Sequence, residues 1–250
     1  MLFHKSPSEF EVFNDQNQDL ANLYRCVRDR PEELIRELEY ALNSRADFLI
    51  LKDRMKIPGA LTDVKRAAAF YQLVSHSYAS GLKSFGGTPF SMWDRFPPIR
   101  ECCARLQRVV VENRDFEDLI RIYDRPDTLF YCDPPYYDAE NYYKGVSFTR
   151  ADHERLASAL HSIEGMFLLS YNDCPEIIAI HSQPGIMIES VTRLSNLAQR
   201  YEGGRRYAEL LIANYDITTG PQYQLTLPEI TGGGPGAESL TAERKVIHHG

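Results

Sequence analysis

Apolar residues recur at helical spacing through the first half of the chain. In residues 19–42 they follow a period of three to four, interrupted at Pro31, where acids in the next positions mark a new helix start. A second helical pattern covers 63–82, and Pro97-Pro98 starts a third helix. Because nothing in 43–107 alternates like a strand, we predict a mostly helical insertion there.

Short apolar segments with strand character alternate with helical patterns in the second half. This alternation is typical of an α/β fold with a twisted, largely parallel sheet covered by helices. A short strand at 9–13 is also expected before the first helix. The expected later strands are 108–112, 128–132, 166–171, 185–191 and 207–215, and the expected helices between them are 116–122, 152–163 and 174–180.

The composition agrees with one large α/β domain that carries an insertion. The 250 residues are 43% hydrophobic and 25% charged, which is ordinary for a soluble globular protein. No apolar run approaches the length needed to cross a membrane. Five cysteines without a C-x-x-C pair favour a reducing cytoplasm and argue against a metal site. The glycine-rich, aperiodic segment 228–250 predicts a disordered tail.

Charge is distributed unevenly along the chain. Residues 52–114 contain eleven basic and five acidic residues, a local balance of +6 within a chain of net charge −7. A basic segment inside an acidic protein is expected of an insertion that contacts DNA phosphates. The alternative is a solvated helical face.

The tetrapeptide Asp133-Pro134-Pro135-Tyr136 follows the expected strand 128–132. Its prolines fix φ and remove two backbone donors, which leaves a stiff loop whose carbonyls can accept hydrogen bonds. Ligands of open α/β sheets bind at this end of the strands. The motif therefore predicts a pocket for a flat ligand that bears an amino group, with a simple surface turn as the alternative.

Two more acidic residues follow expected strands. Asp15 comes after 9–13 and Asp115 after 108–112. A carboxylate at such a position commonly accepts the two hydroxyls of a nucleotide ribose, and Phe116 is suited to cover an adenine ring. For Asp15 alone, a helix N-cap is an equally good explanation.

These residues resemble the Dam-type, or alpha-group, adenine-specific DNA methyltransferases. The order and spacing of the matching segments are right from residue 2 to about 216. The segments that carry the resemblance are Asn14-Asp15-Gln16-Asn17 with Asp19-Leu20-Ala21-Asn22-Leu23-Tyr24, Asp115-Phe116, Tyr131-Cys132-Asp133-Pro134-Pro135-Tyr136, Leu169-Ser170-Tyr171-Asn172-Asp173 and Arg206-Tyr207-Ala208-Glu209-Leu210-Leu211-Ile212-Ala213-Asn214-Tyr215.

The resemblance implies methyl transfer from S-adenosylmethionine to the exocyclic amino group of an adenine in double-stranded DNA. It implies a Rossmann-like S-adenosylmethionine-dependent methyltransferase sheet in 1–42 and 108–227, with 43–107 as the helical target-recognition insertion. Asp133 and the Pro134 carbonyl would accept the two amino hydrogens, and Tyr136 would stack on the flipped base.

The resemblance also assigns the remaining site residues. Asp133, Pro134, Pro135 and Tyr136 form the catalytic motif. The cofactor-binding residues would be Asp15, Asp115, Phe116 and Asp133, and the candidates for DNA contacts are Lys65, Arg66, Lys83, Arg95 and Arg100.

One family feature is absent from this sequence. The family opens with a strand and a glycine-rich loop that cradles the methionine part of the cofactor, but no glycine precedes Lys5. We therefore expect a methyltransferase whose first, central strand is missing, so that two strand edges face a gap unless an upstream fragment supplies the strand and the loop.

Two other functions remain open at this stage. The chain could be a non-catalytic remnant that retains DNA binding through its basic insertion. It could also methylate RNA or protein amides, since related tetrapeptides serve those reactions. The sequence does not distinguish an orphan enzyme from one of a restriction-modification pair.

Overall fold

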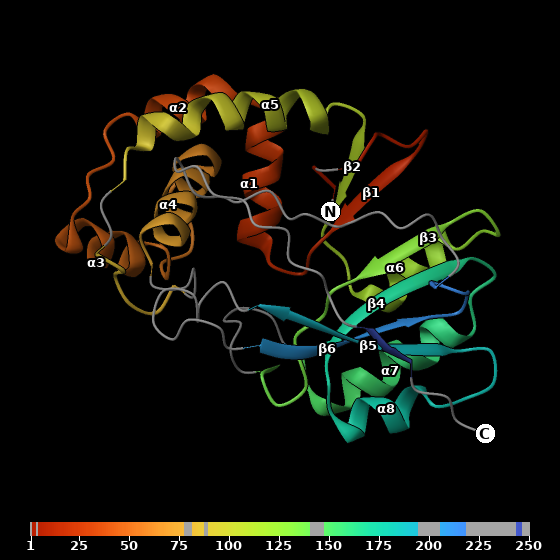
Figure 1. Cartoon of the computed structure of the whole chain (residues 1–250). Coiled ribbons are helices and arrows are strands. Elements are labelled where there is room, and N and C mark those ends of the chain that lie inside the picture. The colour runs from red at the N-terminus through yellow and green to blue at the C-terminus, as the bar shows by residue number, and fades with distance from the viewer. Residues whose placement is uncertain are drawn as a thin grey trace, which may run out of the picture. The chain divides into compact units, whose positions relative to one another are not determined.

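The protein is described by a computed structural model (Figure 1). The described residues are 2–3, 5–77, 82–87, 90–140, 148–194, 206–218 and 244–246. Those up to Leu119 form one compact unit and those from Ile120 onward form a second, with the boundary inside helix α6 (Phe116–Tyr123).

The first unit contains a two-stranded parallel sheet. Strand β1 (Glu11–Asn14) pairs with β2 (Val109–Glu112) in a register that sets Glu11 beside Val109 and Asn14 beside Glu112. Because the two strands are parallel, the residues that follow each of them emerge at the same edge. This sheet agrees with the strands expected at 9–13 and 108–112.

Helices make up most of the first unit. Asn17 caps the first helix, accepting hydrogen bonds from the amides of Asp19 (2.9 Å) and Leu20 (3.4 Å), and Pro31 opens the second at a position where a missing N–H is harmless. The helices are α1 (Gln18–Asp29), α2 (Pro31–Leu38), α3 (Arg45–Arg54), α4 (Asp63–His76) and α5 (Phe96–Leu106), with a short 3₁₀ helix η2 (Met92–Arg95) before α5.

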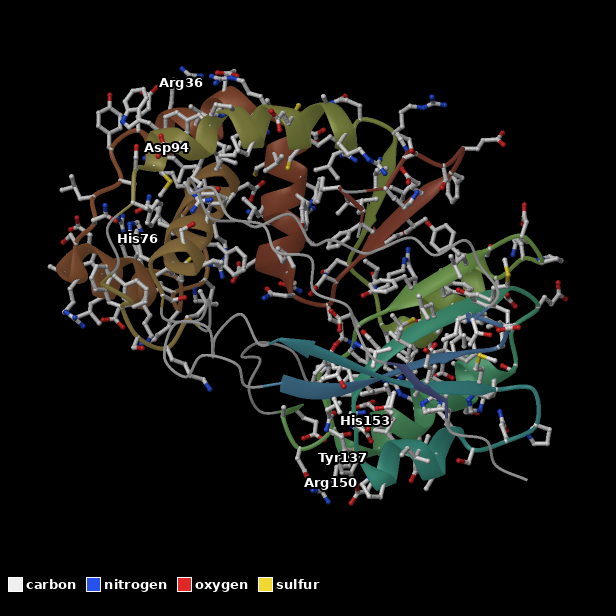
Figure 2. The ribbon with its side chains drawn as sticks, viewed as in Figure 1. Arg36, His76, Asp94, Tyr137, Arg150 and His153 are labelled. Atoms are coloured by element: carbon white, nitrogen blue, oxygen red, sulfur yellow. The ribbon has the colours of Figure 1, made fainter. Side chains whose placement is uncertain are left out.

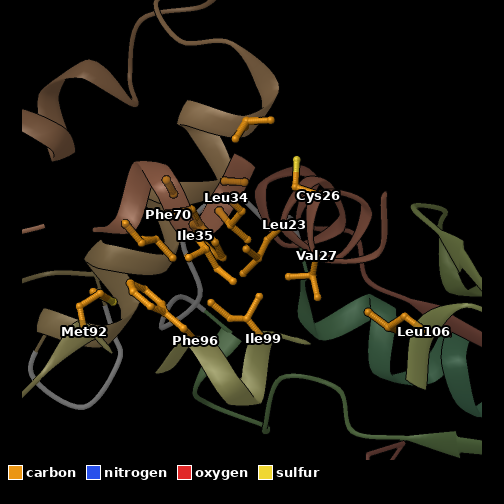
Figure 3. Packing of buried hydrophobic residues seen from close by; sticks show 14 of the residues in the cluster. Leu23, Cys26, Val27, Leu34, Ile35, Phe70, Met92, Phe96, Ile99 and Leu106 are labelled. Atoms are coloured by element: carbon orange, nitrogen blue, oxygen red, sulfur yellow. The ribbon is translucent and has the colours of Figure 1, made fainter. Parts of the chain in front are cut away.

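The apolar faces of these helices enclose one core (Figure 3). Leu34, Leu38, Ala67 and Leu106 are fully buried in it. Burial of such side chains stabilises the fold by about 1.5 to 3 kcal/mol each for the leucines. The predicted helical character of 43–107 is confirmed for its described residues, where the only strand-type pairing is an isolated bridge between Ser77 and Phe85.

The second unit contains a five-stranded sheet of mixed direction. Its order is β3-β4-β6-β5-β7, formed by β3 (Leu129–Cys132), β4 (Met166–Asn172), β6 (Arg206–Ala213), β5 (Met187–Leu194) and β7 (Arg244–Val246). Only β3 and β4 are parallel; β6 runs antiparallel to both β4 and β5, and β7 runs antiparallel to β5.

The expectation of a largely parallel sheet is therefore wrong for this unit. A parallel pair needs a crossover connection, usually a helix, and the sequence has a helical pattern between β3 and β4 but none between β5 and β6. Consecutive strands without such a crossover pair antiparallel, and β6 enters the sheet between β4 and β5.

Helices α7 (Arg150–His161) and α8 (Pro175–His181) pack together and cover one face of this sheet (Figure 1). A capping box fixes the start of α7, because Thr149 and Asp152 bond reciprocally. Phe167, Leu169 and Tyr171 alternate along β4 and are fully buried, so the core of this unit lies on that face.

In the described part of the chain, β1 pairs only with β2, and β3 pairs only with β4. No described strand joins the two sheets. The expectation that a central strand is missing between β1 and β3 stays a prediction.

Strand β7 lies within the segment 228–250, for which the sequence predicts disorder. The structure differs from that expectation at these three residues, and the rest of the segment is outside the described residues. Of the described helices, none is both long enough and apolar enough to cross a membrane.

Candidate active site

The Asp133–Tyr136 motif directly follows β3, as expected from the sequence. The hydroxyl of Ser170 donates a hydrogen bond to Oδ1 of Asp133 at 3.0 Å. Ser170 belongs to β4, which lies beside β3 in the sheet. The motif carboxylate is thus held by a neighbouring strand and not by its own loop.

The aromatic end of the motif is also held by strand residues. The Tyr136 hydroxyl donates to Oε1 of Glu209 on β6 at 2.7 Å. Asn172 of β4 makes two bonds to the backbone of Tyr137: its Oδ1 accepts from the amide at 2.9 Å, and its Nδ2 donates to the carbonyl at 3.3 Å. These contacts give the loop a defined path beyond the two prolines.

A second network ties the end of this loop to α7. His153 is 1% exposed; its Nε2 lies 3.0 Å from Oε1 of Glu140 and its Nδ1 lies 2.7 Å from the Tyr171 hydroxyl. A neutral ring protonated at Nε2 satisfies both contacts, donating to Glu140 and accepting from Tyr171. Burial alone would raise the pKa of Glu140, but hydrogen bonds from backbone amides and His153 hold that pKa below its ordinary value.

Arg150 lies beside Tyr137, at the end of the loop (Figure 2). The Arg150 guanidinium lies 5.0 Å from the centre of the Tyr137 ring and forms an ion pair with Asp138. Asp138 has a positive φ of 65°, which an aspartate tolerates better than most residues. The loop therefore turns sharply one residue after Tyr137.

Cys132, the last residue of β3, precedes the motif. Burial and the nearby charge of Asp133 raise the pKa of this thiol to about 12. The thiol stays protonated near neutral pH, so Cys132 is not suited to act as a nucleophile.

Asp15 and Asp115 of the first unit lie at the same edge of the β1–β2 sheet. The Gln16 side chain donates to Oδ2 of Asp115 at 3.3 Å, and the Asn113 side chain donates to the Asp15 carbonyl at 2.7 Å. Asp15 and Asp115 thus follow paired parallel strands, and the side-chain amides of Gln16 and Asn113 link the two loops.

The structure separates the two explanations of Asp15. The N-cap of α1 is Asn17, and Asp15 instead accepts a bond from the Asn17 amide at 2.7 Å. Burial raises the pKa of Asp15 and the Asn17 amide opposes that rise. Asp15 thus orders the turn that leads into α1 without capping the helix itself.

An open hollow of about 430 Å³ lies beside this edge. It is bordered by α1 and the end of β2. Its lining residues are Ala21, Arg25, Val111, Glu112, Asn113 and Arg114. Asp15, Asp115 and Phe116 are not among them, so the hollow adjoins these candidates without containing them.

The model of the D12 class N6 adenine-specific DNA methyltransferase family matches residues 2–195. The chain belongs to this family. Its members are transferases that methylate adenine in DNA, and the match spans β1 through β5 with both groups of carboxylates. A similar protein is the Type II methyltransferase M1.LlaDCHI of Lactococcus lactis subsp. cremoris, 25% identical over 238 residues, which are 86% of this chain and 82% of the relative.

Within this family member, the five basic candidates for DNA contacts differ in their surroundings. Arg66 forms a two-bond ion pair with Asp19 (2.5 and 3.2 Å), and Arg100 forms one with Glu32 (2.8 Å for both). Arg95 lies 5.3 Å from the centre of the Phe90 ring. Lys65 and Lys83 are exposed, in α4 and in the segment that follows it.

The described residues contain no group of three or more His, Cys, Asp or Glu side chains arranged to hold a metal ion. The methyltransferase family assignment does not depend on one.

Sequence reasoning did not assign roles to Ser170, Asn172 and Glu209. All three lie in segments that carried the family resemblance, and each is a polar residue in a mostly apolar strand. Polar residues at such strand positions are the signal by which the sequence could have indicated them, because a buried polar side chain needs a specific hydrogen-bond partner.

Proposed function

We propose that this protein transfers a methyl group from S-adenosylmethionine to the N6 amino group of an adenine in double-stranded DNA. The observation that carries the proposal is the placement of the Asp133 carboxylate at the carboxyl end of β3, with Oδ1 engaged by Ser170. Oδ2 and the Pro134 carbonyl are then the acceptors suited to the two amino hydrogens.

An acceptor pair of this kind serves the chemistry of an aromatic amine. The lone pair of an adenine amino group is delocalised into the ring, which makes the nitrogen a weak nucleophile. Hydrogen bonds to a carboxylate and a carbonyl stabilise the positive charge that develops on the nitrogen as it forms the new bond. They also direct the lone pair out of the ring plane, toward the methyl donor.

Tyr136 is suited to bind the target base. A base within a duplex is not accessible to Asp133, so the adenine must leave the stack, and an aromatic face compensates for the stacking that it loses. The bond from the Tyr136 hydroxyl to Glu209 restrains the orientation of the ring. Because only the hydroxyl takes part in this bond, it does not alter the ability of the ring to stack.

S-adenosylmethionine would supply an electrophilic methyl group bonded to a sulfonium. Asp15, Asp115 and Phe116 are the residues we propose to hold its nucleoside part, and Asp133 completes the cofactor-binding set. The donor chemistry fits, because two carboxylates at the edge of β1 and β2 can accept ribose hydroxyls and an adenine amino group. Burial raises the pKa of Asp15 because its carboxylate has lost contact with water. A ribose hydroxyl that donates to this carboxylate would stabilise its charged form.

The segment 43–107 is our proposed target-recognition insertion, within a catalytic domain made of 1–42 and 108–227. Its excess of basic residues supports contacts to DNA phosphates. Among the candidates, exposed Lys65 is better suited to phosphate contacts than Arg66 and Arg100, which already pair with carboxylates.

Likeness to a Type II methyltransferase supports a site-specific role beside a restriction enzyme. The compartment that this function requires is the one that holds the DNA, the cytoplasm in a cell without a nucleus.

The test is methylation of adenine-containing duplexes by the full chain with isotopically labelled S-adenosylmethionine. We expect N6-methyldeoxyadenosine in digests of the product DNA, and its loss in Asp133→Ala. The matched control is Asp127→Ala, which removes an exposed carboxylate two residues before the start of β3 and should leave the rate unchanged.

Two other outcomes would overturn the proposal. Salt-sensitive DNA binding without methyl transfer would identify the chain as a DNA-binding remnant. Label in RNA or in protein amides, with none in DNA, would assign a different substrate class.

A further inference from the structure

We propose that Ser170, Asn172 and Glu209 form a polar platform that positions the loop 133–137 for methyl transfer. The inference rests on the proposed function and assigns positioning roles to three residues outside the motif. It is carried by the strand register and by the loop contacts.

The register places the three residues on one face of the β4–β6 ladder. Ser170 and Asn172 are two positions apart on β4 and therefore point to the same side. Asn172 is paired directly with Glu209 on the antiparallel strand β6, so their side chains share that side as well. The intervening residue, Tyr171, is fully buried on the opposite face against His153.

Each platform residue forms hydrogen bonds with a different part of the loop. Ser170 donates to the Asp133 carboxylate, Glu209 accepts from the Tyr136 hydroxyl, and Asn172 bonds both backbone groups of Tyr137. Together these contacts restrain the proposed hydrogen-bond acceptor, the proposed stacking ring and the exit of the loop.

The loop needs such outside support for a chemical reason. Pro134 and Pro135 have no N–H, so these two positions cannot donate to a neighbouring strand or to a turn within the loop. Their rings restrict φ, but the rotation of the Asp133 carboxylate and the χ1 of Tyr136 remain to be set by contacts from other residues.

The burial of two platform residues makes their bonds specific. Ser170 is 8% exposed and Glu209 is 9% exposed. A buried carboxylate that accepts from a hydroxyl at 2.7 Å forms a charge-assisted bond, which is stronger than a neutral one and is competed for little by water. An apolar strand face would pack as well but would leave the loop groups without these partners.

If the platform positions the loop, substitutions in it should lower kcat and change KM little. In Ser170→Ala and Glu209→Leu we expect kcat to fall by about tenfold to on the order of 10²-fold, because a small misplacement of the reacting groups has that effect. The KM values for DNA and for S-adenosylmethionine should stay within about threefold. Glu209→Gln keeps a side-chain acceptor for the Tyr136 hydroxyl and should restore most of the rate.

A double-substitution cycle tests the Tyr136–Glu209 contact directly. Tyr136→Phe keeps the stacking face and removes the donor. If the two residues act through their bond, Tyr136→Phe combined with Glu209→Leu should be no slower than the slower single variant. Effects that multiply would overturn the assigned link.

The matched control is Ser190→Ala. Ser190 lies on β5 of the same sheet and donates to Oδ2 of Asp173 at 2.8 Å, so its loss removes a similar serine–aspartate bond that involves no residue of the loop 133–137. We expect wild-type turnover in this variant. Wild-type turnover in Ser170→Ala and Glu209→Leu as well would overturn the platform while leaving the proposed function intact.

Amide hydrogen exchange tests the platform without any need for activity. In wild type the Tyr137 amide should be protected, and Asn172→Ala should raise its exchange rate at least about tenfold while the β4 amides stay protected. Unchanged protection would overturn the platform. If wild type itself methylates no duplex, the proposed function fails, and exchange still decides whether these three residues order the loop.

Discussion

Asp15 and Asp133 follow strands in the two units of this protein, yet they are held in different ways. Asp15 accepts from the amide of Asn17, two residues further along the chain. Asp133 accepts from the hydroxyl of Ser170, 37 residues away on a neighbouring strand. The first carboxylate is ordered by its own turn, whereas the second depends on correct strand pairing.

The same contrast extends to their surroundings. Beyond the Asn17 bond, the Asp15–Asp115 edge is joined by backbone and side-chain amides from two parallel strands in register. The motif loop is instead held by β4 and β6 on one side and by the His153 network on the other. The proposed cofactor-binding residues are thus placed by local turns, while the proposed reacting group is placed by the sheet.

The largest expected effect is on the kinetic constants, which should respond differently to the loss of each carboxylate. Asp133→Ala should lower kcat on the order of 10³-fold, because it removes a charged acceptor that acts as the bond forms. Asp15→Ala should instead raise the KM for S-adenosylmethionine by about tenfold and change kcat little. Steady-state kinetics with both substrates varied would measure this, and equal effects on kcat would contradict the division of roles.

A second prediction concerns the stability of the first unit. Glu11 is 7% exposed and bonds Arg105 through both carboxylate oxygens, at 2.6 and 2.7 Å. Arg105→Met leaves that carboxylate with Lys5 and the Ser8 backbone and should lower the free energy of unfolding by about 2 kcal/mol. Denaturant titration measures it, and Arg100→Met, which breaks an exposed pair with Glu32, is the control expected to change little.

The pH dependence of this pair follows from its pKa. Hydrogen bonds from Arg105 hold the pKa of Glu11 at about 2, against an ordinary value of 4.5, despite the opposing effect of burial. The stabilisation is present above the ordinary value and is lost as the pH falls toward 2. In Arg105→Met this acid dependence should be reduced.

The second unit should respond to milder acid. Burial, with smaller effects from His161 and His153, lowers the pKa of His181 to about 3. The unfolded chain binds a proton there below about pH 6.5 while the folded chain does not, so stability falls as the pH drops through that range. Between pH 7 and pH 5.5 we expect a loss on the order of 1 kcal/mol.

His181→Leu provides the comparison for this effect. The variant should show a flatter dependence between pH 7 and pH 5.5, measured by denaturant unfolding at both pH values. His161, whose Nε2 lies 3.0 Å from Nδ1 of His181, is partly exposed and can exchange that contact for water. An unchanged slope would contradict the neutral buried state of His181.

The smallest expected effect concerns DNA affinity. Lys65→Ala should weaken binding a few-fold on every sequence and reduce the slope of log affinity against log salt by about one. Arg100→Ala should change the slope less, because Arg100 is already paired with Glu32. Binding titrations at several salt concentrations would measure both, and equal slopes would contradict the distinction between Lys65 and the ion-paired Arg100.

Much of the local structure follows from the sequence. The helical periods place α1, α2 and α5 to within a few residues, because Pro31, Pro97 and the spacing of apolar positions are signals contained in neighbouring residues. The signal that predicts β3, the strand before Asp133, also lies in neighbouring residues. The pairing of β6 between β4 and β5 is not, since strand order depends on contacts between distant segments.

The candidate site divides in the same way. The sequence by itself determined that Asp15, Asp115 and Asp133 follow strands, and that two prolines stiffen the last of these loops. Only the tertiary structure decided that Ser170, Asn172 and Glu209 hold that loop, that Asn17 and not Asp15 caps α1, and that Arg66 and Arg100 pair with carboxylates. Turn and strand preferences arise between neighbours, whereas a hydrogen bond across a sheet exists only once the register is set.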